Sequence, residues 1–327
     1  MKHFHSVRNV RELSSLVAKA REYDQEPFLH PQKGKGLRLG LVFFNPSLRT
    51  RLSTEIAAQN LGLTTIVYSV QKDGWSLEFE DGTVMNGSTT EHVKEAASVL
   101  GRYFDILGVR TFPGLTDQEA DQQERIWNAF CTYSNIPVIS LESATLHPLQ
   151  SLADLVTIDK DLETKTGRGL FASGSTRPKV VLHWAPHVKA LPHCVANSFT
   201  EWALASNAID LTIAAPPGYA LAPHFTDGAR LTHDSSEALE GAEYVYVKNW
   251  SSYDSYGQTP PVQDDWMLTE SKLRHSPDAK IMHCLPVRRN LVLPDELLDG
   301  PRSMVIDQAH HRVGAAQAVL AEIIEAL

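Results

Sequence analysis

The order of predicted elements indicates an α/β protein of about two domains with parallel sheets. Short β-rich runs alternate with helical patterns along the chain, which is typical of βαβ units. The length of 327 residues fits about two domains, and a hydrophobic fraction of 43% can fill their cores.

The strands and helices are expected in regular alternation. The expected strands are Leu39–Phe44, Thr65–Ser69, Ile106–Arg110, Val138–Leu141, Lys179–Ala185, Leu211–Ala215, Glu243–Lys248, Lys280–Cys284 and Met304–Asp307. The expected helices are Leu52–Leu61, Glu91–Tyr103, Leu152–Leu162, Ser198–Ser206 and Ala315–Leu327. The domain boundary should lie near Gln150, and the polar stretch Thr164–Thr176 should be a surface loop. The last helix is amphipathic and could pack on either domain.

The composition argues against several classes of protein. The formal net charge of -9 does not suit a general nucleic-acid binder. The sequence has no apolar run of about 18 residues, and its first residues lack the apolar core of a signal peptide. The cysteines Cys131, Cys194 and Cys284 follow no metal spacing and suggest no disulfide framework. We therefore expect a cytoplasmic protein without a metal.

Positive residues of this acidic chain gather near the predicted strand ends. Ligands of open α/β sheets bind outside the carboxyl ends of strands, so cations there fit a small anionic ligand. Each of them alone could equally be a solvated residue in a surface ion pair. The residues are Arg49, Arg51, Arg110, Lys248, Arg288, Arg289 and Arg312.

The first motif, Asn45–Arg51, follows a strand and opens a helix. Ser47 is expected to be the N-cap, and the helix amides and dipole would then attract an oxyanion. Ser47 and Thr50 add hydroxyl donors, and Arg49 adds a planar fork suited to phosphate. The alternative is a capped helix with surface arginines. Neither a Walker loop nor a glycine-rich dinucleotide loop fits, because the glycines are absent.

Two further polar motifs follow strands. Glu142 precedes His147-Pro148-Leu149-Gln150, in which an imidazole could polarise a carbonyl and a glutamine amide could fix an NH2 group. The third motif, His283–Arg289, could turn backbone carbonyls inward to hold an ammonium or amide hydrogen. Its Leu285-Pro286 step favours an unusual peptide geometry. Taken alone, either motif could be an ordinary turn.

These motifs together resemble the diagnostic segments of the aspartate/ornithine transcarbamylase superfamily. The segments are Ser-Leu-Arg-Thr-Arg at 47–51, His-Pro-Leu-Gln at 147–150 and His-Cys-Leu-Pro-Val-Arg-Arg at 283–289. The resemblance covers nearly the whole chain, including Trp75, Arg110 and Arg312. Trp184–His187 and Lys248–Trp250 resemble the subgroup that acts on N-acylated ornithines. The Ser-Met-Gly loop of ordinary ornithine transcarbamylases is not apparent.

The resemblance implies two doubly wound α/β domains with parallel sheets and a knotted chain in the second, a rare feature. Residues 1–150 would bind carbamoyl phosphate and residues 151–307 an acylated ornithine. The C-terminal helix, 308–327, would return to the first domain. The resemblance also implies a homotrimer with shared active sites, in which Trp75 comes from a neighbouring subunit.

Residue roles follow from the resemblance alone. Carbamoyl phosphate would be bound by Ser47, Leu48, Arg49, Thr50, Trp75, Arg110, His147, Gln150, Cys284, Leu285 and Arg312. The catalytic residues of that set would be Arg49, His147, Gln150, Cys284 and Arg312. The acylated amino acid would be held by Glu142, His187, Lys248, Arg288 and Thr90. A neutral δ-amine would attack the carbamoyl carbon as phosphate leaves, without cofactor, metal or covalent intermediate.

Two positions favour N-succinyl-L-ornithine as the acceptor, with N-succinyl-L-citrulline as product in arginine biosynthesis. At the position of Thr90, acetylornithine enzymes carry an acidic residue and succinylornithine enzymes carry proline. At the position of Val292, acetylornithine enzymes carry a lysine. Removing a like charge favours the extra carboxylate of a succinyl group. The loop 188–195 has fewer prolines than the corresponding loop of succinylornithine enzymes. The alternatives are an N-acetylornithine transcarbamylase, an ordinary ornithine transcarbamylase, and a non-catalytic phosphometabolite-binding protein on the same fold.

Overall fold

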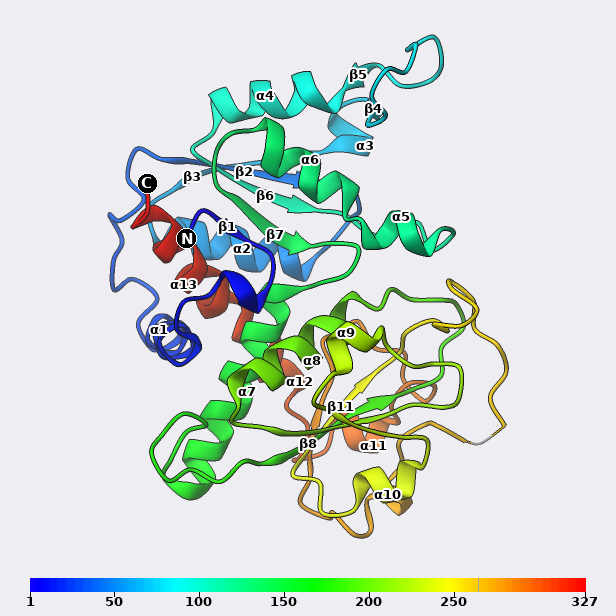
Figure 1. The fold of residues 1–327 in the computed structure, drawn as a ribbon. Helices are drawn as coiled ribbons and strands as arrows, with labels where there is room; N and C mark the ends of the chain where they lie inside the picture. The colour runs from blue at the N-terminus through cyan, green and yellow to red at the C-terminus, as the bar shows by residue number, and fades with distance from the viewer. Residues whose placement is uncertain (264) are drawn as a thin grey trace. The chain divides into compact units, whose positions relative to one another are not determined.

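The computed structural model describes residues 1–263 and 265–327, which divide into two compact units (Figure 1). The first unit is Met1–Leu149 with Arg312–Leu327, and the second is Gln150–His311. Each unit contains a five-stranded sheet, and every pairing within the two sheets is parallel. The predicted α/β class with parallel sheets is therefore confirmed. The C-terminal helix returns to the first unit, and the knot stays a prediction.

The sheet of the first unit has the strand order β1-β7-β6-β2-β3. Its strands are β1 (His3–Phe4), β2 (Arg38–Phe43), β3 (Thr64–Ser69), β6 (Ile106–Arg110) and β7 (Val138–Glu142). Strands β6 and β7 are buried along their whole length, because helices cover both faces of a parallel sheet. The last residue of each, Arg110 and Glu142, is charged. A separate short ladder joins β4 (Leu77–Glu78) to β5 (Glu91–His92).

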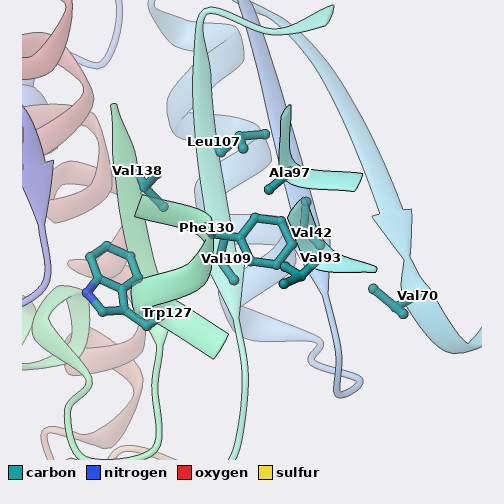
Figure 2. Close-up of a cluster of buried hydrophobic side chains, with 9 residues drawn as sticks. All are labelled: Val42, Val70, Val93, Ala97, Leu107, Val109, Trp127, Phe130 and Val138. Carbon is teal, nitrogen blue, oxygen red and sulfur yellow. The ribbon is translucent and has the colours of Figure 1, made fainter. Parts of the chain in front are cut away.

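Helices lie on both faces of this sheet (Figure 1). On one face α4 (Val93–Tyr103) and α6 (Arg125–Tyr133) pack on β2, β6 and β7 through an apolar cluster (Figure 2). The cluster consists of Val42, Val70, Val93, Ala97, Leu107, Val109, Trp127, Phe130 and Val138. On the other face α13 (Arg312–Ile324) packs against α1 (Leu13–Gln25) and α2 (Arg49–Asn60). The shorter elements are η1 (Val7–Asn9), α3 (Val70–Asp73) and α5 (Gln118–Gln122).

The sheet of the second unit has the strand order β10-β9-β8-β11-β12. Its strands are β8 (Lys179–Trp184), β9 (Asp210–Ala214), β10 (Arg230–Thr232), β11 (Tyr244–Lys248) and β12 (Lys280–Met282). The helices are α7 (Pro148–Thr166, which begins in the first unit), α8 (Cys194–Ser206), α9 (Pro223–Thr226), α10 (Ser235–Leu239), η2 (Glu270–Leu273), α11 (Asp295–Leu298) and α12 (Val305–His310). Strand β11, between β8 and β12, is fully buried and ends at Lys248.

One predicted strand is wrong, because Met304–Asp307 lies in and beside helix α12. The run Met-Val-Ile suggested a strand, but the buried residues of α12 are Val305 and Gln308, three positions apart as one helix face requires. Ile306 is 71% exposed. The predicted loop Thr164–Thr176 also begins too early, since α7 continues to Thr166.

We predict that Gly314→Ala destabilises the protein. Alanine normally stabilises a helix relative to glycine by about 1 kcal/mol. Here a Cβ at Gly314 would lie 2.5 Å from the backbone oxygen of Ala20, so α13 would have to move away from α1. We expect a loss of about 1–3 kcal/mol in the free energy of unfolding, measured by urea denaturation. Gly87→Ala is the control, because its Cβ would meet nothing within 4 Å. Unchanged stability of Gly314→Ala would contradict the close packing of α13 on α1.

Candidate active site

The segment between β2 and α2 brings Ser47, Arg49 and Thr50 to the amino end of a helix. We expected Ser47 to be the N-cap of α2, but the N-cap is Leu48. Leu48 has helical dihedral angles and a side chain that cannot accept a hydrogen bond. Ser47 still serves the first turn, since its Oγ accepts from the Thr50 amide at 3.3 Å. The Nε of Arg49 is buried and has no hydrogen-bond partner among the described residues. A donor in that state suits an anionic ligand.

Arg312 joins this group, although it is 262 positions away from Thr50 in the sequence. It begins α13, and its Nη2 donates to Thr50 Oγ1 at 2.7 Å. Both side chains are buried. A second guanidinium therefore lies at the start of α2, where the dipole of the helix is also positive.

A buried ion pair sits at the ends of β6 and β7. Arg110 donates to Glu142 Oε2 through Nε at 3.1 Å and through Nη2 at 2.8 Å. Its Nη1 donates to the carbonyl oxygens of Asn45 and Pro46, each at 2.9 Å. His147 Nε2 lies 3.7 Å from the same Glu142 oxygen. Arg110 thus holds the backbone that leads into α2, and Glu142 lies between Arg110 and His147.

Glu124 fixes the turn that precedes His147. Its carboxylate accepts from the Ser143 hydroxyl at 2.5 Å, the Ala144 amide at 3.2 Å and the Thr145 amide at 2.7 Å. Burial alone would raise the pKa of Glu124, but the hydrogen bond and charge of His5 and the two hydroxyls of the turn outweigh it. They hold the pKa below its ordinary value of 4.5.

In the second unit, Gln150 and Cys284 belong to one buried group. Gln150 Nε2 donates to Asp154 Oδ1 at 2.8 Å, whereas Gln150 Oε1 is buried and has no hydrogen-bond partner among the described residues. The Tyr246 hydroxyl lies near Asp154 and Cys284 but has no hydrogen-bond partner of normal geometry among the described residues. Burial raises the pKa of Tyr246 well above its ordinary value, and the Asp154 carboxylate raises it further. Tyr246 therefore stays neutral.

The turn after β12 has the unusual backbone that the sequence suggested. The peptide bond between Leu285 and Pro286 is cis, and Leu285 has a φ of 53°. The Leu285 amide donates to His283 Nδ1 at 2.8 Å, and Cys284 is buried. The turn is also held from outside its own segment, because the His283 amide donates to Gln308 Oε1 at 2.9 Å.

Lys248, Arg288 and the neutral His187 form a group with a net positive charge in the second unit. Lys248 ends β11 with only 9% of its surface exposed, and it has no salt bridge in the part of the chain that the structure describes. Burial lowers the pKa of His187; a hydrogen bond with the Lys189 backbone raises it, and the nearby charges of Lys248 and Arg288 lower it again. Cations without carboxylate partners fit an anionic ligand.

Trp75 and Thr90 are brought together by one loop of the first unit. The Thr90 amide donates to the Ser76 carbonyl at 3.0 Å, and Trp75 Nε1 donates to Glu91 Oε2 at 2.8 Å. Trp75 is 51% exposed, and Thr90 is exposed as well. Val292, in contrast, is buried, and its amide donates to the Arg288 carbonyl at 2.9 Å.

Several residues of these groups were not singled out from the sequence. Asp154 is one helical turn after Gln150 on α7, so the spacing of four residues could have indicated a contact. Glu124, Tyr246 and Gln308 carry no such local signal.

Across the described residues, no group of three or more His, Cys, Asp or Glu could hold a metal ion. None of the helices described there is long and apolar enough to cross a membrane.

Two family models match most of the chain. The model for "Aspartate/ornithine carbamoyltransferase, carbamoyl-P binding domain" covers residues 2–160, and the model for "Asp/Orn binding domain" covers residues 193–323. The chain belongs to the aspartate/ornithine carbamoyltransferase family. The resemblance stated from the three motifs is therefore confirmed.

Members of the family that transfer to acylated ornithines are among its relatives. The chain is 43% identical to an N-succinylornithine carbamoyltransferase of Bacteroides thetaiotaomicron, over 100% of both chains. It is 36% identical to an N-acetylornithine carbamoyltransferase of Xylella fastidiosa, over 99% of this chain and 98% of the relative. A solved structure is similar with a TM-score of 0.90 and 34% identity, over 99% of this chain and 100% of that one. It is a glutamate-to-proline mutant of N-acetyl-L-ornithine transcarbamylase complexed with carbamyl phosphate and N-succinyl-L-norvaline.

We predict that Glu124→Gln lowers stability in a pH-dependent way. Glutamine has one acceptor oxygen, and its NH2 group would face an amide of the turn, so the free energy of unfolding should fall by about 1–3 kcal/mol at pH 7. Because the pKa of Glu124 is lowered in the folded state, the stabilisation is present above pH 4.5 and is lost as the pH falls through the folded value. Urea denaturation between pH 7 and pH 3 measures this. A difference between the two proteins that grows on acidification would contradict the assignment.

Proposed function

We propose that the protein transfers the carbamoyl group of carbamoyl phosphate to the δ-amine of N-succinyl-L-ornithine. The products are N-succinyl-L-citrulline and phosphate, and the step belongs to arginine biosynthesis. The observation that carries the proposal is the full-length identity of 43% to an N-succinylornithine carbamoyltransferase, against 36% to an N-acetylornithine carbamoyltransferase. The cytoplasmic location stays a prediction.

The phosphate of the donor substrate is assigned to the start of α2. Ser47 and Thr50 supply hydroxyls, Arg49 supplies a guanidinium with a buried unpartnered Nε, and the helix supplies its dipole. Leu48 and Trp75 complete the proposed phosphate-binding set. Arg110 contributes by holding the carbonyls of Asn45 and Pro46 that precede this turn. These fixed donors would stabilise the charge that grows on phosphate as it leaves.

The carbamoyl group is assigned to His147, Gln150, Arg312 and the turn at Cys284 and Leu285. His147 and Arg312 would donate to the carbonyl oxygen and stabilise the oxyanion of the tetrahedral intermediate. The buried acceptor Gln150 Oε1 suits an N–H of the carbamoyl NH2 group. Holding donor and acceptor together converts a bimolecular reaction into an effectively unimolecular one.

The acylated ornithine is assigned to the positive group Lys248, His187 and Arg288, with Glu142. N-succinyl-L-ornithine has two carboxylates, and the group has cations without carboxylate partners in the described residues. The δ-amine must be neutral when it attacks. The leaving phosphate is a base close to that amine and would accept its proton.

The acyl group is assigned from the loop that carries Thr90. Acetylornithine enzymes carry an acidic residue at this position, and a carboxylate there would repel the second carboxylate of a succinyl group. The similar structure with N-succinyl-L-norvaline is a mutant that lost a glutamate, which is consistent with this argument. An N-acetylornithine enzyme is the nearest alternative. A non-catalytic phosphometabolite-binding protein would bind carbamoyl phosphate without forming either citrulline product.

We predict that N-succinyl-L-ornithine is strongly preferred over N-acetyl-L-ornithine, and that Thr90→Glu reverses or removes the preference. The new carboxylate would oppose the succinyl carboxylate but not the neutral acetyl group. The measurement is kcat/KM for both acceptors, with Thr90→Gln as the uncharged control of the same size. An unmodified enzyme that uses acetylornithine as well or better would refute the acyl assignment. Product formation from neither acceptor would refute the function.

We also propose a homotrimer with shared active sites, for which the first unit offers an exposed apolar surface. Leu48, Leu52 and Ile56 recur every four residues along α2 and are 43–67% exposed. Such a stripe on a helix is typical of an interface. Trp75 is exposed on a loop of the first unit, as expected of a side chain that contributes to another subunit's site.

We predict that Arg49→Ala and Trp75→Ala are each nearly inactive but complement one another. In a mixed cyclic trimer, a site can take Arg49 from a Trp75→Ala chain and Trp75 from a neighbouring Arg49→Ala chain. Such a site has both residues intact. Random equal mixing should restore about a quarter of the sites. Activity is assayed after the two variants are unfolded and refolded together, with each variant refolded alone as control. Proven mixed trimers without restored activity would contradict shared sites.

A further inference from the structure

The carboxylate of Asp154 is the centre of a buried hydrogen-bond network in the second unit. Asp154 lies on α7 and has no exposed surface. Its Oδ1 accepts from Gln150 Nε2 at 2.8 Å and from Gln308 Nε2 at 2.7 Å. The Tyr246 hydroxyl lies near this carboxylate. Two neutral amide donors thus share one buried carboxylate oxygen.

Asp154 Oδ1 accepts from both side-chain amides, so it decides which way these amides face. Each amide must turn its NH2 group toward Asp154 and its oxygen away. Gln308 Oε1 accordingly accepts from the His283 amide at 2.9 Å. Gln150 Oε1 is turned away in the same manner, is buried, and has no hydrogen-bond partner among the described residues.

We propose that Asp154 is a positioning residue that makes Gln150 present its oxygen, and not its NH2 group, to the NH2 of the carbamoyl group. Gln308 fixes the position of the Asp154 carboxylate, because Gln308 Nε2 donates to it while Gln308 Oε1 accepts from the His283 amide. The inference rests on the proposed function for the identity of the ligand. Without Asp154 the Gln150 amide could rotate, and a donor would then face the donors of the carbamoyl NH2.

The test compares two anions that differ in this NH2 group. Binding of carbamoyl phosphate and of inorganic phosphate is measured by calorimetry for the unmodified protein, Asp154→Leu and Gln150→Ala. We expect both variants to weaken carbamoyl phosphate binding by about tenfold, as the loss of one buried hydrogen bond should. Phosphate binding should stay unchanged. The double variant should bind carbamoyl phosphate no more weakly than Gln150→Ala does, because Asp154 acts through Gln150.

The matched control is Asp161→Leu on the same helix. Asp161 accepts from Tyr244, which lies two residues before Tyr246 on β11, but it has no hydrogen bond with Gln150 among the described residues. Carbamoyl phosphate and phosphate should bind to this control variant as they bind to the unmodified protein. Leucine is chosen at position 154 because an asparagine Oδ1 could still accept from both amides, and because an apolar side chain of similar volume often substitutes for a buried charged group. Should Asp154→Leu fail to fold, Asp154→Ala replaces it.

Two results would overturn the inference. One is an equal loss of carbamoyl phosphate and phosphate binding in the Asp154 variant, which would indicate a general structural defect. The other is a full further loss in the double variant, which would show that Asp154 acts independently of Gln150. Absence of N-succinyl-L-citrulline formation by the unmodified protein would refute the proposed acceptor, while the binding pattern would still stand.

Discussion

The buried ion pair between Arg110 and Glu142 is the contact on which the first unit's site depends. The two residues end neighbouring strands, and a register shift after Val109 sets them opposite one another. Removing one partner of such a pair leaves an uncompensated charge and typically costs about 3–5 kcal/mol. Arg110 also holds the two carbonyls before Ser47, and Glu142 lies beside His147. The position of the α2 turn and that of the imidazole are thus tied to one electrostatic contact.

The second unit places a buried carboxyl group in a different environment. Asp154 accepts from the side-chain amides of Gln150 and Gln308, so hydrogen bonds orient these two neighbours. Lys248, at the end of β11, has no carboxylate partner in the described residues. In the proposed assignment, Gln150 Oε1 is available to a ligand because the Gln150 NH2 group donates to Asp154.

The sequence predicted the fold and the site's neighbourhoods because both follow from local patterns. Buried parallel strands are continuous apolar runs, and ligands bind beyond their carboxyl ends, so the motifs after Phe43, Glu142 and Met282 could be found. The helix at 305–310 was mistaken for a strand because three apolar residues carry no distinguishable period. Contacts such as Arg312 with Thr50, or Gln308 with Asp154, join segments more than 150 positions apart and have no local signature. Family resemblance, and not periodicity, assigned Arg312 to the site.

The proposed acyl specificity depends on one loop residue, Thr90, which is separate from the buried groups assigned to carbamoyl transfer. The groups assigned to the carbamoyl chemistry are held by buried contacts of strand and helix ends, where a change of charge would disturb several partners at once. Thr90 is exposed, and its amide is bonded to a backbone carbonyl that any side chain would leave intact. A carboxylate can therefore be gained or lost at this position without altering the fold. In the proposed assignment the cations for the α-carboxylate are Lys248 and Arg288, so discrimination between acetyl and succinyl groups would require only the presence or absence of repulsion at Thr90.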